Sequence, residues 1–341
     1  MTHKLLSALA AAVIFAGGAT VANAKDVPEK KEVHIGAASV GMTYLPLILA
    51  KQLGYFKDEG LDVTIAAFSG GSKALEALLG GSTDMVAGAY SNTITMAVKG
   101  QKLVTVAAQV NCPAWIFGVA KKDADKVKEV KDLKGMRVGV SAPGSSTHMA
   151  VNYMLHKAGL QPEDVSIIGV GQAAGAVAAI RAGQINALIV NDPVATILVE
   201  GGDLVPLAEM RTAEGNKKVF GSDYPESSIY TTKAFIDKNP KTVQAVVNGI
   251  VRAEHWIAKA TPKQIVDTVP EEYVVDNKDL YAKGFENSRR CLSQTGLIQP
   301  EGAATVRDVL AAFDPAVGSA KIDLSATYDN SFAQKAEGQV K

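Results

Sequence analysis

Ser141-Ala142-Pro143-Gly144-Ser145-Ser146-Thr147-His148 is the stretch from which the fold of this chain can be read. Residues 137–140 precede it, are rich in valine and predict a short buried strand. Apolar residues recur at helical spacing from Met149 to Ala158, and Gly159 follows where a helix commonly ends. A glycine and hydroxyl loop therefore joins the carboxyl end of a strand to the amino end of a helix, where open α/β sheets bind ligands.

The residue types of this loop suit an anion. The first turn of a helix has unpaired backbone N–H groups and a partial positive charge, and nearby hydroxyls add hydrogen-bond donors. The alternative is that Ser145, Ser146 or Thr147 only caps the helix, as such residues commonly do. The loop alone does not decide between a binding site and a cap.

The composition is that of an ordinary globular protein. The chain has 341 residues, of which 47% are hydrophobic and 21% charged, and its length suggests two domains. Basic and acidic residues are equal in number, so the formal net charge is zero. A nucleic-acid-binding protein needs a basic face, so we expect no nucleic-acid partner.

Residues 1–24 have the features of a secretory signal peptide. Lys4 supplies the positive charge, residues 5–15 form an apolar segment, and Ala22-Asn23-Ala24 matches a cleavage site. The apolar segment is too short to cross a bilayer, and no cysteine near the cleavage site offers a lipid attachment point. We therefore expect an exported, soluble mature protein that begins at Lys25.

Cys112 and Cys291 are the cysteines of the chain. An oxidising compartment permits a disulfide between them, but two buried free thiols fit the sequence equally well. Because bridging depends on the separation of the Cα atoms, the sequence leaves the pairing open.

Strands and helices are expected to alternate over most of the chain, which implies mostly parallel sheets. The strands are expected at residues 33–38, 62–68, 84–89, 103–109, 116–120, 137–140, 165–170, 187–190, 205–208 and 228–232. Residues 75–86 and 178–189 echo each other as helix, glycine, short turn and strand, which indicates two lobes of similar topology. Residues 234–313 are mainly helical in pattern, and the polar residues after Asp314 indicate a loosely held tail.

Several phrases of the sequence resemble a known family. Gly41-Met42-Thr43-Tyr44-Leu45-Pro46 and then Gly54-Tyr55-Phe56-Lys57-Asp58-Glu59-Gly60-Leu61-Asp62-Val63 resemble the opening of the solute-binding proteins of nitrate, sulfonate and taurine ABC importers. Residues 132–140, residues 144–148 and the Asp192-Pro193 pair resemble them as well. The likeness covers residues 33–236, and its phrases are specific in combination but weak singly.

The resemblance implies a type II periplasmic binding fold, an α/β architecture in which two lobes are joined by two crossover strands. Residues 25–115 and 230–330 would form a discontinuous first lobe, and residues 116–229 the second lobe. Residues 331–341 would be a polar tail. The crossover strands would be residues 116–120 and 228–232.

In such a fold, the loops that follow the strands line a cleft between the lobes. The residues expected to bind ligand on this basis are Thr43, Tyr44, Ser69, Gly70, Gly71, Ser72, Tyr90, Ser91, Asn92, Gly144, Ser145, Ser146, Thr147 and Asp192. Asp192 is a candidate ligand acceptor, hinge partner or turn residue, and these alternatives stay open. The Tyr44, Tyr90 and Trp115 rings are candidates to contact a ligand, with core packing as the alternative.

The resemblance implies the substrate-binding component of an ABC importer. Such a protein would capture a small anionic solute, such as a sulfonate, nitrate, bicarbonate or carboxylate, by hinge closure in the periplasm. Its partner would be the membrane permease subunits of the importer. We expect a monomer that needs no metal or cofactor and is not an enzyme.

The alternative is an enzyme on the same fold, because thiamine-precursor synthases and menaquinone-pathway lyases share it. The export signal counts against this alternative, and the cysteine-rich motif of the synthases is absent from the sequence. The sequence also has no zinc-protease motif and no hydrolase nucleophile elbow. His148 has no identifiable partner acid and is expected to be structural. The sequence contains no feature that distinguishes a sensing role from a transport role.

Export with cleavage after Ala24 is the first testable expectation, because the charged, apolar and small-residue regions follow the order of a signal peptide. Intact-mass and N-terminal analysis of the periplasmic fraction should find Lys25 as the first residue. Recovery of chains that retain Met1 in the cytoplasmic fraction would contradict it.

Overall fold

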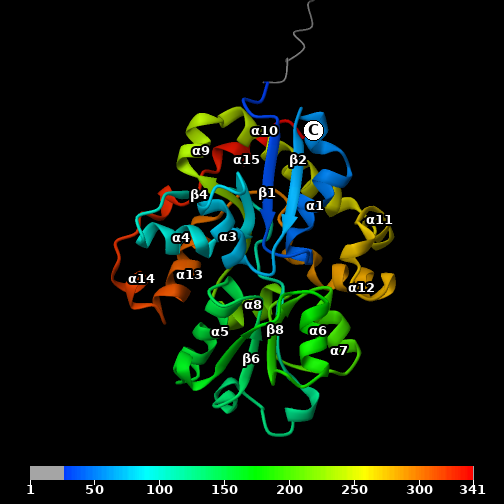
Figure 1. Cartoon of the computed structure of the whole chain (residues 1–341), viewed down its shortest axis with the longest axis vertical. Coiled ribbons are helices and arrows are strands. Elements are labelled where there is room, and N and C mark those ends of the chain that lie inside the picture. Colours follow the sequence, from blue (N-terminus) through cyan, green and yellow to red (C-terminus); the bar gives the residue numbers. More distant parts are fainter. Residues whose placement is uncertain (1–26, 341) are drawn as a thin grey trace, which may run out of the picture.

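The computed structural model describes residues 27–340, so the expected signal peptide lies outside the described residues. These residues form two α/β lobes, one above the other in Figure 1. The first lobe is built on a sheet with the strand order β2-β1-β3-β10-β4, and the second lobe on a sheet with the order β7-β6-β8-β5-β9. Within residues 27–340, no helix combines the length and the apolar character needed to cross a bilayer.

The strands lie close to where the sequence predicts them. Those of the first sheet are β1 (Glu32–Ala37), β2 (Asp62–Ala67), β3 (Met85–Ala89), β4 (Leu103–Ala108) and β10 (Ser227–Thr232). Those of the second sheet are β5 (Trp115–Ala120), β6 (Arg137–Val140), β7 (Ser166–Gly169), β8 (Ala187–Asn191) and β9 (Leu204–Glu209).

Helices cover both sheets. Those between the strands are α1 (Leu45–Gln52), α2 (Tyr55–Asp58), α3 (Gly71–Leu79), α4 (Ser91–Val98), α5 (Ser146–Lys157), α6 (Ala174–Arg181), α7 (Val194–Glu200) and α8 (Ala213–Phe220). Those that follow β10 are α9 (Lys233–Lys238), α10 (Pro240–Lys259), α11 (Pro262–Thr268), α12 (Lys278–Ser288), α13 (Pro300–Ala311), α14 (Pro315–Ser319) and α15 (Ser331–Glu337). Short 3-10 turns are η1 (Met42–Tyr44), η2 (Lys121–Asp123), η3 (Val130–Leu133), η4 (Pro162–Asp164), η5 (Glu271–Tyr273), η6 (Arg289–Cys291) and η7 (Leu324–Ala326).

Each sheet contains a strand that runs against its neighbours. β10 pairs antiparallel with β3 and β4, and β5 pairs antiparallel with β8 and β9. The pairs β1–β2, β1–β3, β6–β7 and β6–β8 are parallel, so the other strands of each sheet share one direction. The prediction of mostly parallel sheets is therefore confirmed for all strands except β5 and β10. The matching strand orders confirm that the lobes have similar topology.

The predicted crossover strands need a correction. β5 pairs over its length with strands of the second sheet, and β10 with strands of the first, so each belongs to one lobe. The chain crosses between the lobes in residues 109–114 and again in residues 221–226, after α8. These crossings lie side by side, because Gln109 N donates to Ser227 O (2.8 Å) and Tyr224 N donates to Asn111 O (3.2 Å).

A disulfide pins the first crossing to the C-terminal region. Cys112 and Cys291 are bonded, with Cα atoms 4.9 Å apart, and this answers the question that the sequence left open. Beside the bond, Asn111 N donates to Cys291 O at 2.7 Å. The hinge between the lobes is therefore held by the paired crossings and by the covalent link to η6.

The C-terminal helices are not confined to the first lobe. A hydrophobic cluster joins Tyr90 and Ile94 of the first lobe to Trp115 and Phe117 of the second, and α13 packs into it through Val306. α13 contacts both α4 and α5, and α12 contacts α7. Helices expected to belong to the first lobe therefore also buttress the second, as Figure 1 shows for α13 beside α5.

The expectation of a loosely held polar tail is wrong. Residues 331–337 form α15, which packs on α10 and buries Ala333 and Ala336 completely. Gln244 Nε2 of α10 donates to Phe332 O at 2.9 Å, and His255 Nε2 lies 2.6 Å from Glu337 Oε1. Small alanines give a weak hydrophobic signal in the sequence, yet they allow close contact between helices.

The helices α7 and α8 were also not expected from the sequence. α7 contains valine, threonine and isoleucine, whose β-branched side chains favour strands, so its pattern does not indicate a helix. α8 has a mainly polar sequence, and its start is stabilised by Thr212, whose side chain accepts a hydrogen bond from Gly215 N at 3.0 Å.

Loss of the disulfide should lower the stability of the whole molecule. The bond closes a loop between residues 179 positions apart, and native disulfides of this kind typically contribute about 2–5 kcal/mol. A Cys112→Ala, Cys291→Ala double variant should therefore melt at a lower temperature than the parent under oxidising conditions. Reductant should lower the melting temperature of the parent and leave that of the variant unchanged. Equal melting temperatures for parent and variant would show that the bond contributes nothing.

Candidate ligand-binding site

A small cavity lies between the lobes. Its volume is about 20 Å³, which suits a group of about the size of a water molecule. Its walls are Ala38, Ser39, Tyr44, Gly71, Trp115, Ser141, Ser146, Thr147, Gln172, Asn191 and Glu226. Residues of both lobes and of the second crossing therefore enclose one space, and the lobes are closed on each other.

The sheet topology brings these residues together. Ser39 and Ser141 follow β1 and β6, Asn191 ends β8, and the carboxyl ends of these strands face the cleft. Gly144 has a φ of +80°, a left-handed conformation that favours glycine, and it lets the chain turn from β6 into α5. The first turn of α5 then places Ser146 and Thr147 at the cavity.

Four of the residues predicted from the sequence line the cavity, namely Tyr44, Gly71, Ser146 and Thr147. Thr147 Oγ1 accepts from Ser141 N at 3.0 Å and lies 2.8 Å from Ser141 Oγ, so its position is fixed. Burial raises the pKa of Tyr44 well above 10, and the nearby carboxyl of Glu226 adds to this shift, so the phenol stays neutral.

Ser72 and Ser145, also predicted to bind ligand, lie beside the cavity, in the contact between the lobes. Ser145 occupies the N-cap position of α5, but its side chain does not cap α5. Ser145 Oγ instead accepts from Ser72 N in the first turn of α3, at 3.0 Å, and lies 3.2 Å from Ser72 Oγ. Ser72 Oγ donates to Pro143 O at 3.0 Å. A hydroxyl of the second lobe thus caps a helix of the first lobe.

The rest of this contact is tight backbone packing. A Cβ atom on Gly70 would lie 2.7 Å from Ala142 Cβ and 2.9 Å from Ser145 Oγ, so the close approach requires glycine. Ser69 and Gly144 are exposed at its rim. We call Ser72, Pro143 and Ser145, with Gly70 beneath them, the lobe clasp; its residues do not line the cavity.

Asp192 is a structural residue and not part of the cavity wall. Its carboxylate is fully buried and accepts hydrogen bonds from Thr196 Oγ1 (2.6 Å) and Ser288 Oγ (2.6 Å). Arg211 Nη1 lies 3.3 Å from the same carboxylate. Asp192 therefore ties β8 to α7 and α12 and does not line the cavity, which fits the alternative of a hydrogen-bond partner that the sequence left open.

The remaining predicted residues are buried behind the cavity. Tyr90 OH lies 2.6 Å from Thr327 Oγ1, and Asn92 Nδ2 donates to Tyr230 OH at 2.9 Å. Thr43 Oγ1 accepts from Asn191 Nδ2 at 3.2 Å, so it positions a lining residue. Ser91 is buried and is not in the cavity wall. These side chains support the site without reaching it.

Sequence reasoning missed Glu226 and undervalued Trp115 for the same reason. Both lie at the amino ends of the reversed strands, β10 and β5, and reversal places these amino ends at the cleft. Glu226 Oε1 accepts from Ser146 Oγ at 2.8 Å, across the lobes. Burial raises the pKa of Glu226 to about 7. A reversed direction of β10 is the signal that would have brought Glu226 to notice.

Gln172 is another lining residue that the sequence did not indicate. Its Nε2 donates to Ile189 O at 3.2 Å, and its Oε1 accepts from Asn191 N at 3.0 Å. It therefore holds the end of β8 in place beside the cavity.

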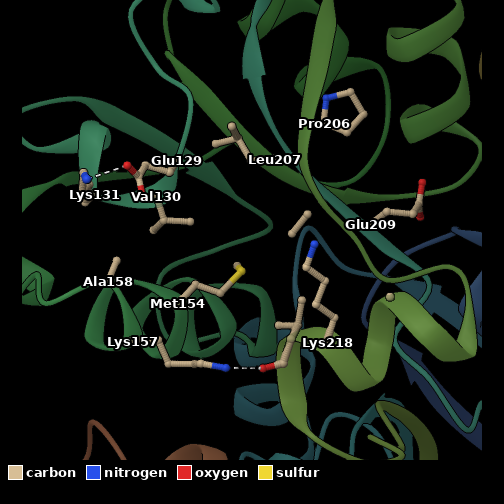
Figure 2. Close-up of a pocket in the computed structure, with 13 residues that line it drawn as sticks. Glu129, Val130, Lys131, Met154, Lys157, Ala158, Pro206, Leu207, Glu209 and Lys218 are labelled. Atoms are coloured by element: carbon tan, nitrogen blue, oxygen red, sulfur yellow. Dashed lines mark hydrogen bonds and ion pairs between the residues drawn. The ribbon is translucent and has the colours of Figure 1, made fainter.

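A larger hollow of about 700 Å³ opens on the second lobe between α5, β9 and α8 (Figure 2). Three of its charged side chains have partners, since Lys131 pairs with Glu129 (2.5 Å) and Lys157 Nζ donates to Val219 O (3.0 Å). None of the residues predicted as ligand-binding lines it. We take the smaller cavity as the candidate site, because it is enclosed by both lobes and contains buried polar atoms that lack partners among residues 27–340.

The chain has relatives among characterised and uncharacterised proteins. It is 23% identical over 261 residues to the putative binding protein YtlA of Bacillus subtilis strain 168, covering 76% of each chain. It is also 24% identical over 262 residues to THI11 of Saccharomyces cerevisiae, a 4-amino-5-hydroxymethyl-2-methylpyrimidine phosphate synthase, covering 71% of each chain.

Solved structures resemble the whole molecule. A protein from Bordetella bronchiseptica RB50 is 44% identical, with a TM-score of 0.89 and coverage of 92% of this chain and 98% of the other. The alkanesulfonate-binding protein SsuA of Xanthomonas axonopodis pv. citri, bound to MOPS, is 20% identical with a TM-score of 0.72, covering 89% of this chain and 99% of the other. This second likeness concerns the fold alone, and it confirms the periplasmic binding fold.

The family model also matches most of the chain. The model of the NMT1-like family covers residues 26–269, which include all of both sheets and every residue that lines the cavity. The chain is therefore a member of the NMT1-like family with the fold of the periplasmic binding proteins.

Proposed function

We propose that this protein is the substrate-binding component of an ABC importer and captures a small solute between its lobes. The observation that carries this proposal is the cavity, whose wall is shared by both lobes and by the crossing that joins them. Separating the lobes opens this wall, so binding and closure are coupled. Because the cavity as it stands holds only a group of about the size of a water molecule, a larger solute would keep the lobes slightly farther apart. Relatives named as binding proteins support this role.

One group of residues would contact the solute, and another would stabilise the closed lobes. Tyr44, Gly71, Ser146 and Thr147 would contact the solute, together with Asn191 and Glu226. The lobe clasp would stabilise the closed state without touching the solute, since its hydroxyls bond across the lobes. Closure would be reversible because a single neutral hydrogen bond contributes only about 1 kcal/mol.

The cellular setting is part of the same proposal. Export by the segment before Lys25 would deliver the protein to the periplasm, where a monomer would pass its solute to the permease subunits of the importer. The sulfonate, nitrate, bicarbonate and carboxylate classes stay in the proposed solute set, because the amino ends of α3 and α5 adjoin the cavity.

An enzyme on the same fold is the second candidate, and the synthase THI11 among the relatives is the observation that favours it. The candidates differ in what happens to the solute. A binding protein returns the bound compound unchanged, whereas an enzyme releases a product, so mass spectrometry of compounds recovered from the protein distinguishes them.

A thermal-shift screen of the mature protein against small anions and neutral polar solutes tests the proposal. A bound solute stabilises the folded state in proportion to its occupancy, so at least one compound should raise the melting temperature. The same compound should reduce the radius of gyration in small-angle scattering, because it favours the closed lobes. An unchanged scattering profile at saturating solute would rule out the two-lobe clamp.

Ser145→Ala should weaken solute binding about threefold to tenfold. The variant removes the acceptor for Ser72 N, so the closed state loses about 1 kcal/mol and the solute must supply that energy. Calorimetric titration with the best compound of the screen measures the loss. Ser82→Ala, at an exposed serine of the same lobe as Ser72, is the matched control and should bind like the parent. Equal affinities for Ser145→Ala and the control would show that the clasp does not stabilise closure.

A further inference from the structure

Glu226 presents an oxygen atom to the cavity that nothing in residues 27–340 satisfies. The residue is 3% exposed and lines the cavity from the second crossing. Its Oε1 accepts the hydroxyl of Ser146, but Oε2 has no hydrogen-bond partner within the described chain. A buried carboxyl oxygen without a partner is costly, so its presence at a cavity indicates a place for a donor.

Asn191, another residue of the cavity wall, has a second such atom. Its Nδ2 donates to Thr43 Oγ1 at 3.2 Å, and its backbone N donates to Gln172 Oε1 at 3.0 Å. These bonds fix the amide, yet Oδ1 is buried without a partner among the residues that the structure describes. Two residues of the cavity wall therefore each have an acceptor without a partner, an amide oxygen from the second lobe and a carboxyl oxygen from the second crossing.

The rest of the lining offers no positive charge. No lysine, arginine or histidine of residues 27–340 lines the cavity, and the Ser141 and Thr147 hydroxyls already bond to each other. A simple anion such as nitrate would meet a carboxyl group with no basic residue to offset it. Donor groups on the solute would instead satisfy both open acceptors.

We infer that the solute of this site carries N–H donors, as an amine, amidine or amide does, and that Glu226 Oε2 and Asn191 Oδ1 accept them. The inference rests on the proposed function and narrows its solute class. An anionic group is compatible with it only when the same molecule also carries a donor. Glu226 is then a specificity residue, because a solute without the donor leaves its oxygen unpaired in the cavity.

Burial also raises the pKa of Glu226 to about 7, from an ordinary value of 4.5. The groups that face it are neutral, since Tyr44, Tyr224 and Tyr230 surround the carboxyl and the pKa of each is raised above 10. Near neutral pH the side chain therefore exists in both protonation states, and a donor on the solute would favour the carboxylate.

A matched set of probes tests the inference. Glycine, aminomethanesulfonate, acetamidine and urea carry N–H donors, whereas acetate, methanesulfonate and nitrate are acceptors only at pH 7.5. We expect the largest thermal shift from a compound of the first group. A largest shift from the second group would overturn this inference and leave the proposed function standing. No shift from either group would overturn both.

Glu226→Gln keeps the size of the side chain and replaces an open acceptor with an amide donor. The affinity for the best donor-bearing probe should fall roughly ten- to a hundredfold, while nitrate and acetate should gain. Glu254→Gln is the matched control, because Glu254 of α10 is equally buried but lies outside the cavity wall. Binding that is unchanged in Glu226→Gln would overturn the inference. Asn191→Ala removes the second acceptor, and should it also bind donor-bearing probes like the parent, the inference fails even where Glu226→Gln does not fold.

Discussion

The reversed strand inside each sheet is the constraint on which the rest of the structure depends. β10 is inserted between β3 and β4, and β5 between β8 and β9, each antiparallel to its neighbours. Each of them is reached from the other lobe, so the chain must cross at the edge where the parallel strands end. The crossings therefore lie at the cleft, and residues at the amino ends of β5 and β10 become part of its wall. Trp115 and Glu226 are in the cavity for this reason.

Closure of the lobes is a question of satisfying buried polar groups. Opening would return the N–H of Ser72 and the hydroxyls of Ser145 and Ser146 to water, and closing pairs them across the lobes. Because such an exchange has a small net free energy, the closed state is only weakly favoured by the protein itself. Among the residues that line the cavity, Glu226 Oε2 and Asn191 Oδ1 are buried without a partner within residues 27–340. A solute that supplies the missing bonds would then shift the balance.

The sequence predicted local features better than directions and distant partners. The strand–loop–helix unit around Ser145 and the positions of β5 and β10 were predictable from hydrophobic pattern and glycine spacing. The direction of β10 was not, because the pattern of a strand is the same in either direction, and Glu226 was missed as a consequence. Ser145 was predicted either to bind ligand or to cap its own helix, whereas its hydroxyl caps α3, which lies far away in sequence. The role of Asp192 was left open because its partners Ser288 and Arg211 lie far from it in sequence or outside any local motif.

The bond between Cys112 and Cys291 also determines how the chain would behave when cut. The segment between these residues contains the whole second sheet together with α9 to α12, so the second lobe sits inside a covalent ring. A protease that nicks any exposed loop of that lobe opens the ring but releases nothing, since both fragments stay joined through sulfur. The fragments would keep their packed crossings and migrate as one chain until reductant separates them. Cleavage within the second lobe would thus be missed by any assay that measures fragment size under oxidising conditions.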